Sequence, residues 1–174
     1  MRSFCHDESR LGLHLPTHRR VTGFGVKPLQ VVAPLYESYW LYAVVEPTTG
    51  DAFWWEFPRL DAECFTIFLR PLSQHYAESL NIVLLDQVPA HVAQRVQWPE
   101  NVMPVWLPVY SPELNPVGRL WEDVKSRIDV LDVRIRSRLT MLQEHVAGIV
   151  RRYTTEAIAS LTGYTYLVEA IRAL

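Results

Sequence analysis

The segment Leu80–Asp86, with the sequence LNIVLLD, is a continuous apolar run that ends on a single acid. A run of this length and composition is typical of a β-strand that is covered on both faces, as in the centre of an α/β sheet. A carboxylate at the end of such a strand is costly to bury unless a cation or a hydrogen-bond donor binds it. Asp86 is therefore either a cation ligand or a cap for the turn that follows, and its spacing alone leaves both interpretations open.

The segments around this strand predict the rest of a sheet. The runs YWLYAVVE (39–46) and DAFWWEF (51–57) are rich in aromatic and β-branched residues and flank the turn PTTG (47–50), which predicts an antiparallel hairpin. The start RSFCHDE (2–8) predicts a short strand with Asp7 at its C-terminal edge. The run VMPVWLP (102–108) predicts a further strand, and Pro104 favours an edge position for it.

Two helical patterns follow these strands. A buried stripe with helical spacing begins after Asp61 and comprises Phe65, Phe68, Leu69, Leu72 and Tyr76. Pro71 lies inside this stripe and predicts a kink or an early end of the helix. Asn115 is a suitable N-cap for a second helix, with Pro116 at its first position. From about residue 133 onward the pattern is helical, so we expect one α/β domain over residues 1–174: a mixed sheet with an antiparallel hairpin, flanking helices and a helical C-terminus.

The length, charge and composition of the chain limit the classes of protein to which it can belong. The chain has 174 residues, a net charge of −2 and no apolar run near the ~20 residues that span a bilayer. Its polar first residues are unlike a secretory signal, and its 2 cysteines form no metal-type pair, so a cytoplasmic location is expected. Most of the 17 basic residues are arginines, and two strips of basic residues lie within residues 9–36 and 134–152. Such strips are either a solvated face or contacts to nucleic-acid phosphates.

The two acids that follow predicted strands suggest a metal site. If the strands that carry Asp7 and Asp86 are central neighbours, both carboxylates converge at one edge of the sheet. Two acids at that distance repel each other unless a proton or a cation lies between them. Oxygen ligands of this kind suit Mg²⁺ or Mn²⁺, and a pair of such ions can promote displacement at a phosphodiester.

Four segments resemble a known family of proteins. HDES (6–9), LLDQVPAH (84–91), LPVYSPELNPVGRLWEDVK (107–125) and SLTGYTYLVEAI (160–171) are similar to the DDE transposases of bacterial insertion sequences, in the mariner superfamily. In that family the middle motif usually reads Asp-Asn-x-x-x-His and the third reads Tyr-Ser-Pro-x-Leu-Asn-Pro-Ile-Glu-x-x-Trp. The resemblance spans nearly the whole chain and implies a ribonuclease-H-like fold with metal-dependent cutting and joining of DNA.

The resemblance assigns roles to individual residues. Asp7 and Asp86 match the first and second metal-binding acids, and His91 matches the histidine of the middle motif. That histidine either positions DNA, supports Asp86 or simply begins a helix. Trp121 matches the family's tryptophan, but its place on an apolar stripe favours core packing. For the same reason Trp54 and Trp55 are expected in the core or on the hairpin surface, not as a platform for DNA bases.

The third motif departs from the family pattern. Gly118 stands where the third acid is expected, although glycine costs a helix about 1 kcal/mol relative to alanine. A decayed copy of a transposable element would explain this change. Glu122, one helical turn further on the same flank, is a possible substitute ligand or an exposed acid near Lys125. Glu113 precedes the helix at a variable family position and is a weaker candidate. Gln87 for the usual asparagine is a milder departure.

The resemblance to this family also implies the partners of the chain. Members of the family carry an N-terminal helix-turn-helix region that recognises the element's ends, and nothing in this sequence resembles it. We therefore expect the catalytic half alone, acting on double-stranded DNA as a homo-oligomer or with a separate helix-turn-helix subunit, and not on a membrane. The candidate DNA contacts are His91 and six basic residues: Arg19, Arg20, Lys27, Arg134, Arg136 and Arg138.

Three functions are thus compatible with the sequence. The first is a transposase catalytic domain that uses Asp7, Asp86 and Glu122 to cleave DNA and transfer strands. The second is a catalytically inactive relic of the same fold that only binds DNA or a partner subunit. The third is another ribonuclease-H-like nuclease, such as a junction resolvase, and the YSPELNP motif argues against it.

Overall fold

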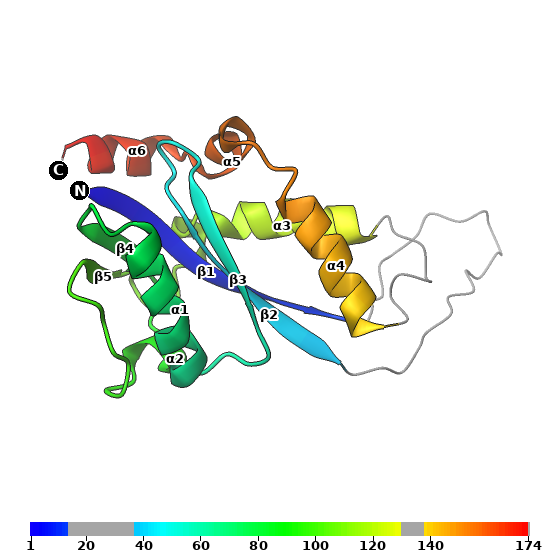
Figure 1. Ribbon diagram of the computed structural model, residues 1–174. Coiled ribbons are helices and arrows are strands. Elements are labelled where there is room, and N and C mark those ends of the chain that lie inside the picture. Colours follow the sequence, from blue (N-terminus) through cyan, green and yellow to red (C-terminus); the bar gives the residue numbers. More distant parts are fainter. Residues whose placement is uncertain (14–36, 130–137, 174) are drawn as a thin grey trace.

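A five-stranded mixed sheet forms the centre of the protein (Figure 1). The structure is a computed structural model that describes residues 1–13, 37–129 and 138–173. The strands are β1 (Arg2–Gly12), β2 (Ser38–Val45), β3 (Ala52–Phe57), β4 (Asn81–Leu85) and β5 (Val102–Trp106), in the order β3-β2-β1-β4-β5. The β1–β2 and β2–β3 pairs are antiparallel, whereas β4 runs parallel to β1 and to β5. The predicted mixed sheet, its hairpin and the edge position of the last strand are confirmed.

Helices cover both faces of this sheet. They are α1 (Ala62–His75), α2 (Pro89–Val92), α3 (Val117–Asp129), α4 (Leu139–Val150), α5 (Thr155–Thr162) and α6 (Thr165–Arg172), with a 3₁₀ turn at Pro112–Leu114. The expected helical C-terminus is confirmed over residues 138–173. Among the described helices, none has the length and apolar character that crossing a membrane requires.

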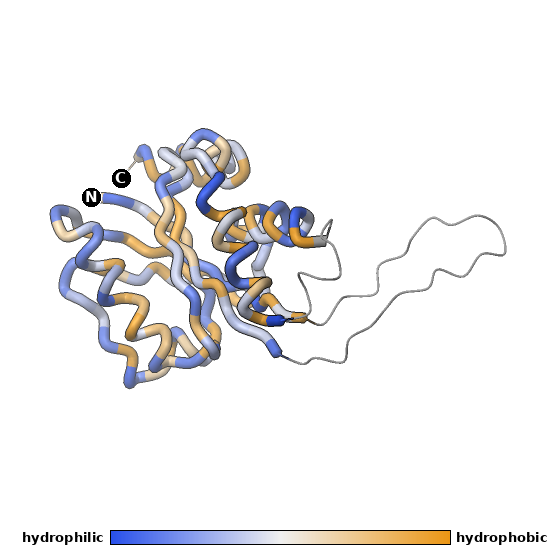
Figure 2. The backbone as a smooth tube through the Cα atoms, turned by 45° about the vertical axis from the view of Figure 1, so that its right-hand side comes forward, coloured by the Kyte–Doolittle hydropathy of each residue, from blue (hydrophilic) through white to orange (hydrophobic). Residues whose placement is uncertain are grey.

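The sheet separates two hydrophobic cores. On one face Phe4 packs with the buried side of α1, and on the other Cys5 and Leu11 pack with α3, α4 and α5. Figure 2 shows hydrophobic residues along the central strands and hydrophilic residues at the periphery. Because side chains alternate along a strand, Asp7 lies on the α3 face with Cys5, and Glu8 lies on the α1 face with Phe4. Two consecutive acids of β1 are therefore directed to opposite sides of the sheet.

Helix α1 differs from its prediction at one point. Its N-cap is Asp61, whose side chain accepts a hydrogen bond from the backbone N–H of Cys64 at 2.9 Å. Pro71 does not end the helix, which continues to His75. The missing N–H of a proline removes one helical hydrogen bond. Leu69 and Leu72, on either side, are fully buried, and the burial of such side chains offsets that loss.

The turn of the β2–β3 hairpin packs against α5. Gly50 has φ +74°, the left-handed region that favours glycine. A Cβ atom at this position would lie 1.8 Å from the carbonyl oxygen of Thr155. Glycine is required here both by the conformation of the turn and by the close approach of the helix.

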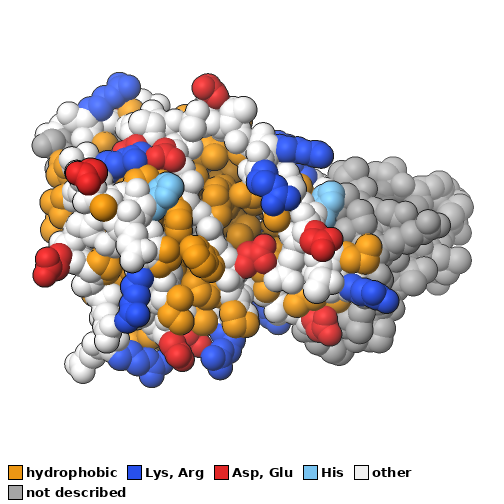
Figure 3. All heavy atoms as spheres, in the orientation of Figure 1, with side chains coloured by type: hydrophobic (Ala, Val, Ile, Leu, Met, Phe, Trp, Pro, Cys, Tyr) orange, Lys and Arg blue, Asp and Glu red, His pale blue; other side chains and the backbone are white. Residues whose placement is uncertain are grey.

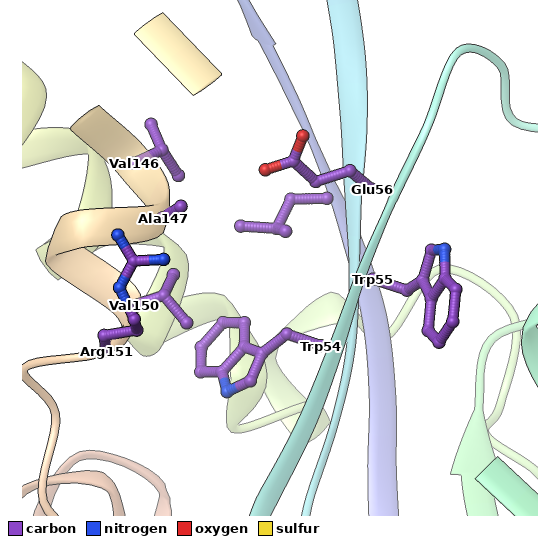
Figure 4. A pocket seen from close by; sticks show the side chains of 8 residues that line it. Trp54, Trp55, Glu56, Val146, Ala147, Val150 and Arg151 are labelled. Carbon is purple, nitrogen blue, oxygen red and sulfur yellow. The ribbon is translucent and has the colours of Figure 1, made fainter. Parts of the chain in front are cut away.

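The tryptophans occupy the positions expected from their patterns. A cavity of about 280 Å³ lies between the hairpin and α4, on the face seen in Figure 3, and Trp54, Val146 and Val150 line it (Figure 4). Trp54 meets Trp121 edge to face at 5.7 Å between ring centroids, and Trp121 is 4% exposed. Trp55 points to the other side of β3 (Figure 4) and is 44% exposed.

Candidate active site

Parallel pairing of β1 and β4 brings Asp7 and Asp86 together. The pairing ends with Cys5 opposite Leu84, and each acid lies two residues beyond this pair, in the same register. Both side chains line one cavity of about 660 Å³, which Gln87, Asn115 and the segment 107–112 complete. The sequence expectation that the two strands are central neighbours is therefore met.

The strand that carries Asp7 is longer than predicted. Instead of ending at Asp7, β1 continues to Gly12, and Asp7 is paired with Ala43 of β2. The acid nevertheless lies at an edge, because β4 ends at Leu85 and leaves that side of β1 open. Antiparallel pairing with β2 explains the extra length of β1, since it continues from Cys5 to Gly12.

The surroundings of Asp7 disfavour its charged form. Burial, then the charge of Glu8 and, to a smaller extent, that of Asp86 raise the pKa of Asp7 to about 6. The charge of His6 and a backbone hydrogen bond at Glu8 oppose this rise. A carboxylate held in this way gains from a bound cation, which would neutralise it and its neighbour together.

A hydrogen bond from His91 holds the side chain of Asp86 in place. Its side chain is 48% exposed, and its Oδ1 accepts a hydrogen bond from Nδ1 of His91 at 2.9 Å. The N-cap of the following α2 is Val88, not Asp86. The acid is therefore anchored by one oxygen while it faces the cavity.

His91 is buried behind the acid. It is 1% exposed, and its Nε2 donates to Oε1 of Glu8 at 2.6 Å. Burial lowers the pKa of His91, but the hydrogen bonds with Asp86 and Glu8 and their charges outweigh it and raise the pKa to about 10. In this position the ring bridges Glu8 and Asp86 and is buried, and the role of His91 in the site stays a prediction.

Glu8 joins a second histidine to this group. Its Oε1 also accepts a hydrogen bond from Nε2 of His6 at 2.8 Å. Burial raises the pKa of Glu8, but the charge and hydrogen bond of His6 and the hydrogen bond of His91 lower it to about 2. The sequence did not indicate that Glu8 belongs to this group. Because side chains alternate along a strand, its place next to Asp7 predicts only that it lies on the opposite face of the sheet.

The three side chains His6, Glu8 and His91 could also be considered as a metal site, because their ligand atoms lie within 4.8 Å of one another. The Glu8 oxygen, however, is 2.8 and 2.6 Å from the two imidazole nitrogens. Ligands around a tetrahedral ion with bonds of about 2 Å are separated by about 3.3 Å. The spacing fits direct hydrogen bonds, so the group is a buried hydrogen-bonded chain.

The start of α3 is tied to β1 beside the acids. Nδ2 of Asn115 donates to the backbone carbonyl of His6 at 2.7 Å, and its Oδ1 accepts from the N–H of Val117 at 3.2 Å. Gly118 follows in the first turn, and a Cβ there would meet nothing within 4 Å. The site of the family's third acid is thus open and carries no side chain.

The remaining candidates lie away from the cavity or outside the described residues. Glu122 and Glu113 are both exposed, and neither lines the cavity of Asp7 and Asp86. Arg138 is exposed at the start of α4. The other basic candidates lie outside the described residues: Arg19, Arg20, Lys27, Arg134 and Arg136.

Tyr110 is a feature of the cavity that the sequence did not single out. It lines the same cavity as the acids, is 99% exposed and has φ 60°. A left-handed conformation is uncommon for residues with a side chain and often accompanies function. Tyr110 is the first residue of the motif YSPELNP, but no local sequence pattern predicts that its side chain is exposed or that its backbone is left-handed.

Comparisons with known proteins show the family and the fold of this chain. Residues 2–140 match the family described as DDE superfamily endonuclease. The Mos1 transposase paired-end complex with the left transposon end has the same fold, with a TM-score of 0.69 at 15% identity over 92% of this chain and 51% of that chain. The Mos1 mariner paired-end complex with Mn gives 0.67 at 15% identity, over 92% and 51%. The mixed sheet with flanking helices is the ribonuclease-H-like fold of these catalytic domains.

A curated relative matches about half of the chain. The uncharacterized protein y4pE/y4sA of Sinorhizobium fredii is 31% identical over 84 residues, which are 48% of this chain and 62% of that protein. This chain also spans about half the length of the Mos1 transposase chains.

Proposed function

Because this chain belongs to the DDE superfamily of endonucleases, we propose that it is the catalytic domain of a transposase, which cleaves and joins DNA strands during transposition. The observation that carries this proposal is the convergence of Asp7 and Asp86, from adjacent parallel strands, on one open cavity. The motif YSPELNP, which follows β5 and leads into α3, supports a transposase over other nucleases of the same fold. Its substrate would be double-stranded DNA.

The donor set fits Mg²⁺ or Mn²⁺. Asp7 and Asp86 offer carboxylate oxygens, the ligands that these hard cations prefer, and the raised pKa of Asp7 reflects a charge that a cation would stabilise. When bound, such ions activate the attacking oxygen and stabilise the leaving oxygen of a phosphodiester. The protein itself holds the two carboxylates in register at one cavity. His91 orients Asp86, and Asn115 fixes the beginning of α3 against β1.

A second candidate function is an inactive relic that binds DNA or a partner subunit. The observation in its favour is Gly118, which leaves the third acidic position without a carboxylate. Glu122, considered as its substitute, is exposed and does not line the cavity. A homo-oligomer and a separate helix-turn-helix subunit are both possible partners for either function, and phosphate contacts would come from exposed arginines such as Arg138.

A cleavage assay separates the two functions. The chain is incubated with Mn²⁺ and a duplex that carries the ends of the element that encodes it, and nicked strands are resolved on a denaturing gel. Cleavage by the parent that Asp86→Asn abolishes supports the transposase. Cleavage that appears only after Gly118→Glu supports the relic. If neither the parent nor Gly118→Glu cleaves the duplex, a catalytic role for the acids is contradicted.

The same assay tests the third ligand. If Glu122 completes the site, Glu122→Ala lowers cleavage at least tenfold, whereas Glu144→Ala, which removes an exposed acid from α4, leaves it unchanged. Equal cleavage by the parent and Glu122→Ala would remove Glu122 from the site.

A further inference from the structure

We propose that Glu8 is a positioning residue, which fixes the Asp86 carboxylate for metal binding by acting through His91. This inference rests on the proposed function, because it assigns Glu8 a task in the site formed by Asp7 and Asp86. Glu8 itself lies on the α1 face of the sheet, its side chain is 4% exposed, and it does not line the cavity. It therefore reaches neither the metal site nor DNA directly.

A continuous chain of hydrogen bonds links Glu8 to Asp86. His91 lies between them, with Nε2 at 2.6 Å from Oε1 of Glu8 and Nδ1 at 2.9 Å from Oδ1 of Asp86. The same Nδ1 is 3.2 Å from the backbone oxygen of Asp86. On the other side of Glu8, His6 bridges Oε1 and the backbone oxygen of Ala43 with distances of 2.8 and 2.8 Å. The chain thus runs from the centre of β2 to the edge of the cavity.

The direction of these bonds follows from the chemistry of the partners. Carbonyl and carboxylate oxygens accept hydrogen bonds, so both ring nitrogens of His91 have to donate. Glu8 fixes the other end of the ring, because its carboxylate accepts from Nε2 of His91 and from Nε2 of His6. In Glu8→Gln a neutral amide replaces this carboxylate, so the hydrogen bond that holds the ring becomes weaker and the ring is less firmly fixed against Asp86.

Packing holds the imidazole ring of His91 in a single orientation. Phe65 lies against it with ring centroids 4.4 Å apart, and the ring of His6 is at 5.2 Å. His91 is 1% exposed, whereas the Asp86 side chain is 48% exposed. The rigid end of the chain is therefore inside the protein and the free oxygen of Asp86 is outside, as a metal ligand requires. Partners of this kind typically change metal affinity 10–100-fold when they are removed.

A purely structural role is the competing explanation for Glu8. A buried charged group is weak evidence for stability, because the loss of hydration opposes the gain from pairing. The structure offers a matched control in Glu46, which is 7% exposed and paired with Arg2 at 2.7 Å, near the hairpin turn. Glu46 does not line the cavity of Asp7 and Asp86. Replacing either residue removes a buried paired carboxylate, but only Glu8 is connected to Asp86.

The experiment compares Glu8→Gln with Glu46→Gln in the whole chain. Calorimetric titration with Mn²⁺ gives the affinity, thermal unfolding gives the stability, and NMR gives the ¹⁵N shifts of His91 and the ¹³C shift of the Asp86 carboxyl group without metal. We expect Glu8→Gln to weaken Mn²⁺ binding at least tenfold and to shift both NMR signals. We expect Glu46→Gln to lower the melting temperature with Mn²⁺ affinity within twofold of the parent.

Several outcomes would overturn the inference. Unchanged Mn²⁺ affinity in a folded Glu8→Gln variant contradicts it, and so does an equal loss of affinity in Glu46→Gln. If Glu8→Gln does not fold, His91→Gln, which removes the connecting ring, has to weaken Mn²⁺ binding instead. If the parent binds no Mn²⁺, the proposed function fails, while the metal-free NMR signals still decide whether Glu8 controls His91 and Asp86.

Discussion

Replacing the first acid should stabilise the metal-free protein while it removes the metal site. Asp7 is partly buried, close to Glu8 and Asp86, and its pKa is raised to about 6. A free aspartic acid titrates near 3.9, and a tenfold change in that equilibrium is worth about 1.4 kcal/mol, which gives an upper limit of about 3 kcal/mol. Because the side chain borders a cavity open to water, we expect about 1–2 kcal/mol for Asp7→Asn at pH 7.5.

The sign follows from proton binding. Between about pH 4 and pH 6 the folded protein retains a proton on Asp7 that the unfolded chain has lost, so stability falls as the pH rises through this window. Above pH 6 the charge on Asp7 is a constant cost to the folded state. Asparagine avoids this cost, and the advantage of Asp7→Asn should therefore shrink on going from pH 7.5 to pH 5.

Urea unfolding in the presence of EDTA measures this difference, with Asp86→Asn as the matched control. Asp86 accepts a hydrogen bond from the charged His91, so its replacement should lower the stability instead. Saturating Mn²⁺ should stabilise the parent and leave Asp7→Asn unchanged. A lower stability of Asp7→Asn at pH 7.5, or a gain that is the same at both pH values, would refute the electrostatic reasoning.

Three further predictions concern the fold and the loop beside the acids. Gly50→Ala should lower the free energy of unfolding by about 2 kcal/mol or more, because the added Cβ would collide with α5. Gly148→Ala, where the added Cβ lies in open space on α4, should raise it by about 1 kcal/mol. Chemical denaturation of both variants measures this contrast. Tyr110→Gly should raise the melting temperature by relieving φ 60°, and an unchanged or lower value would show that the backbone there is not strained. Trp121→Ala should cost about 3–5 kcal/mol, since it opens a cavity beside Trp54, and a loss below about 1 kcal/mol would contradict its place in the core.

Several parts of the structure were predictable because they depend on local patterns. The apolar run before Asp86 predicted a central strand, and the stripe from Phe65 to Tyr76 predicted α1. The family could also be inferred, because the YSPELNP motif and the two aspartates occur in the family's order. The roles of Asp7 and Asp86 as metal ligands stay predictions, and so do those of Glu122 and the basic residues.

Other features depended on residues that are far apart in the sequence. The length of β1 follows from its pairing with β2, which no pattern within residues 2–12 encodes. Pro71 suggested an early helix end, but burial of its neighbours in the core prevailed. His91 was considered for contact with DNA, and the structure instead places its ring between two acids, one of them 83 positions away.

The sequence alone therefore determined which segments become strands and helices, since hydrophobic periodicity acts over a few neighbouring residues. It also predicted Asp7 and Asp86 as metal ligands, because each lies within a segment that resembles a motif of the family, and this assignment stays a prediction. Only the tertiary structure decided that Glu8, His91 and Asp86 form one hydrogen-bonded chain. The physical reason is that hydrogen bonds across a sheet depend on strand register and on the face each side chain occupies, and both are set when the strands pair.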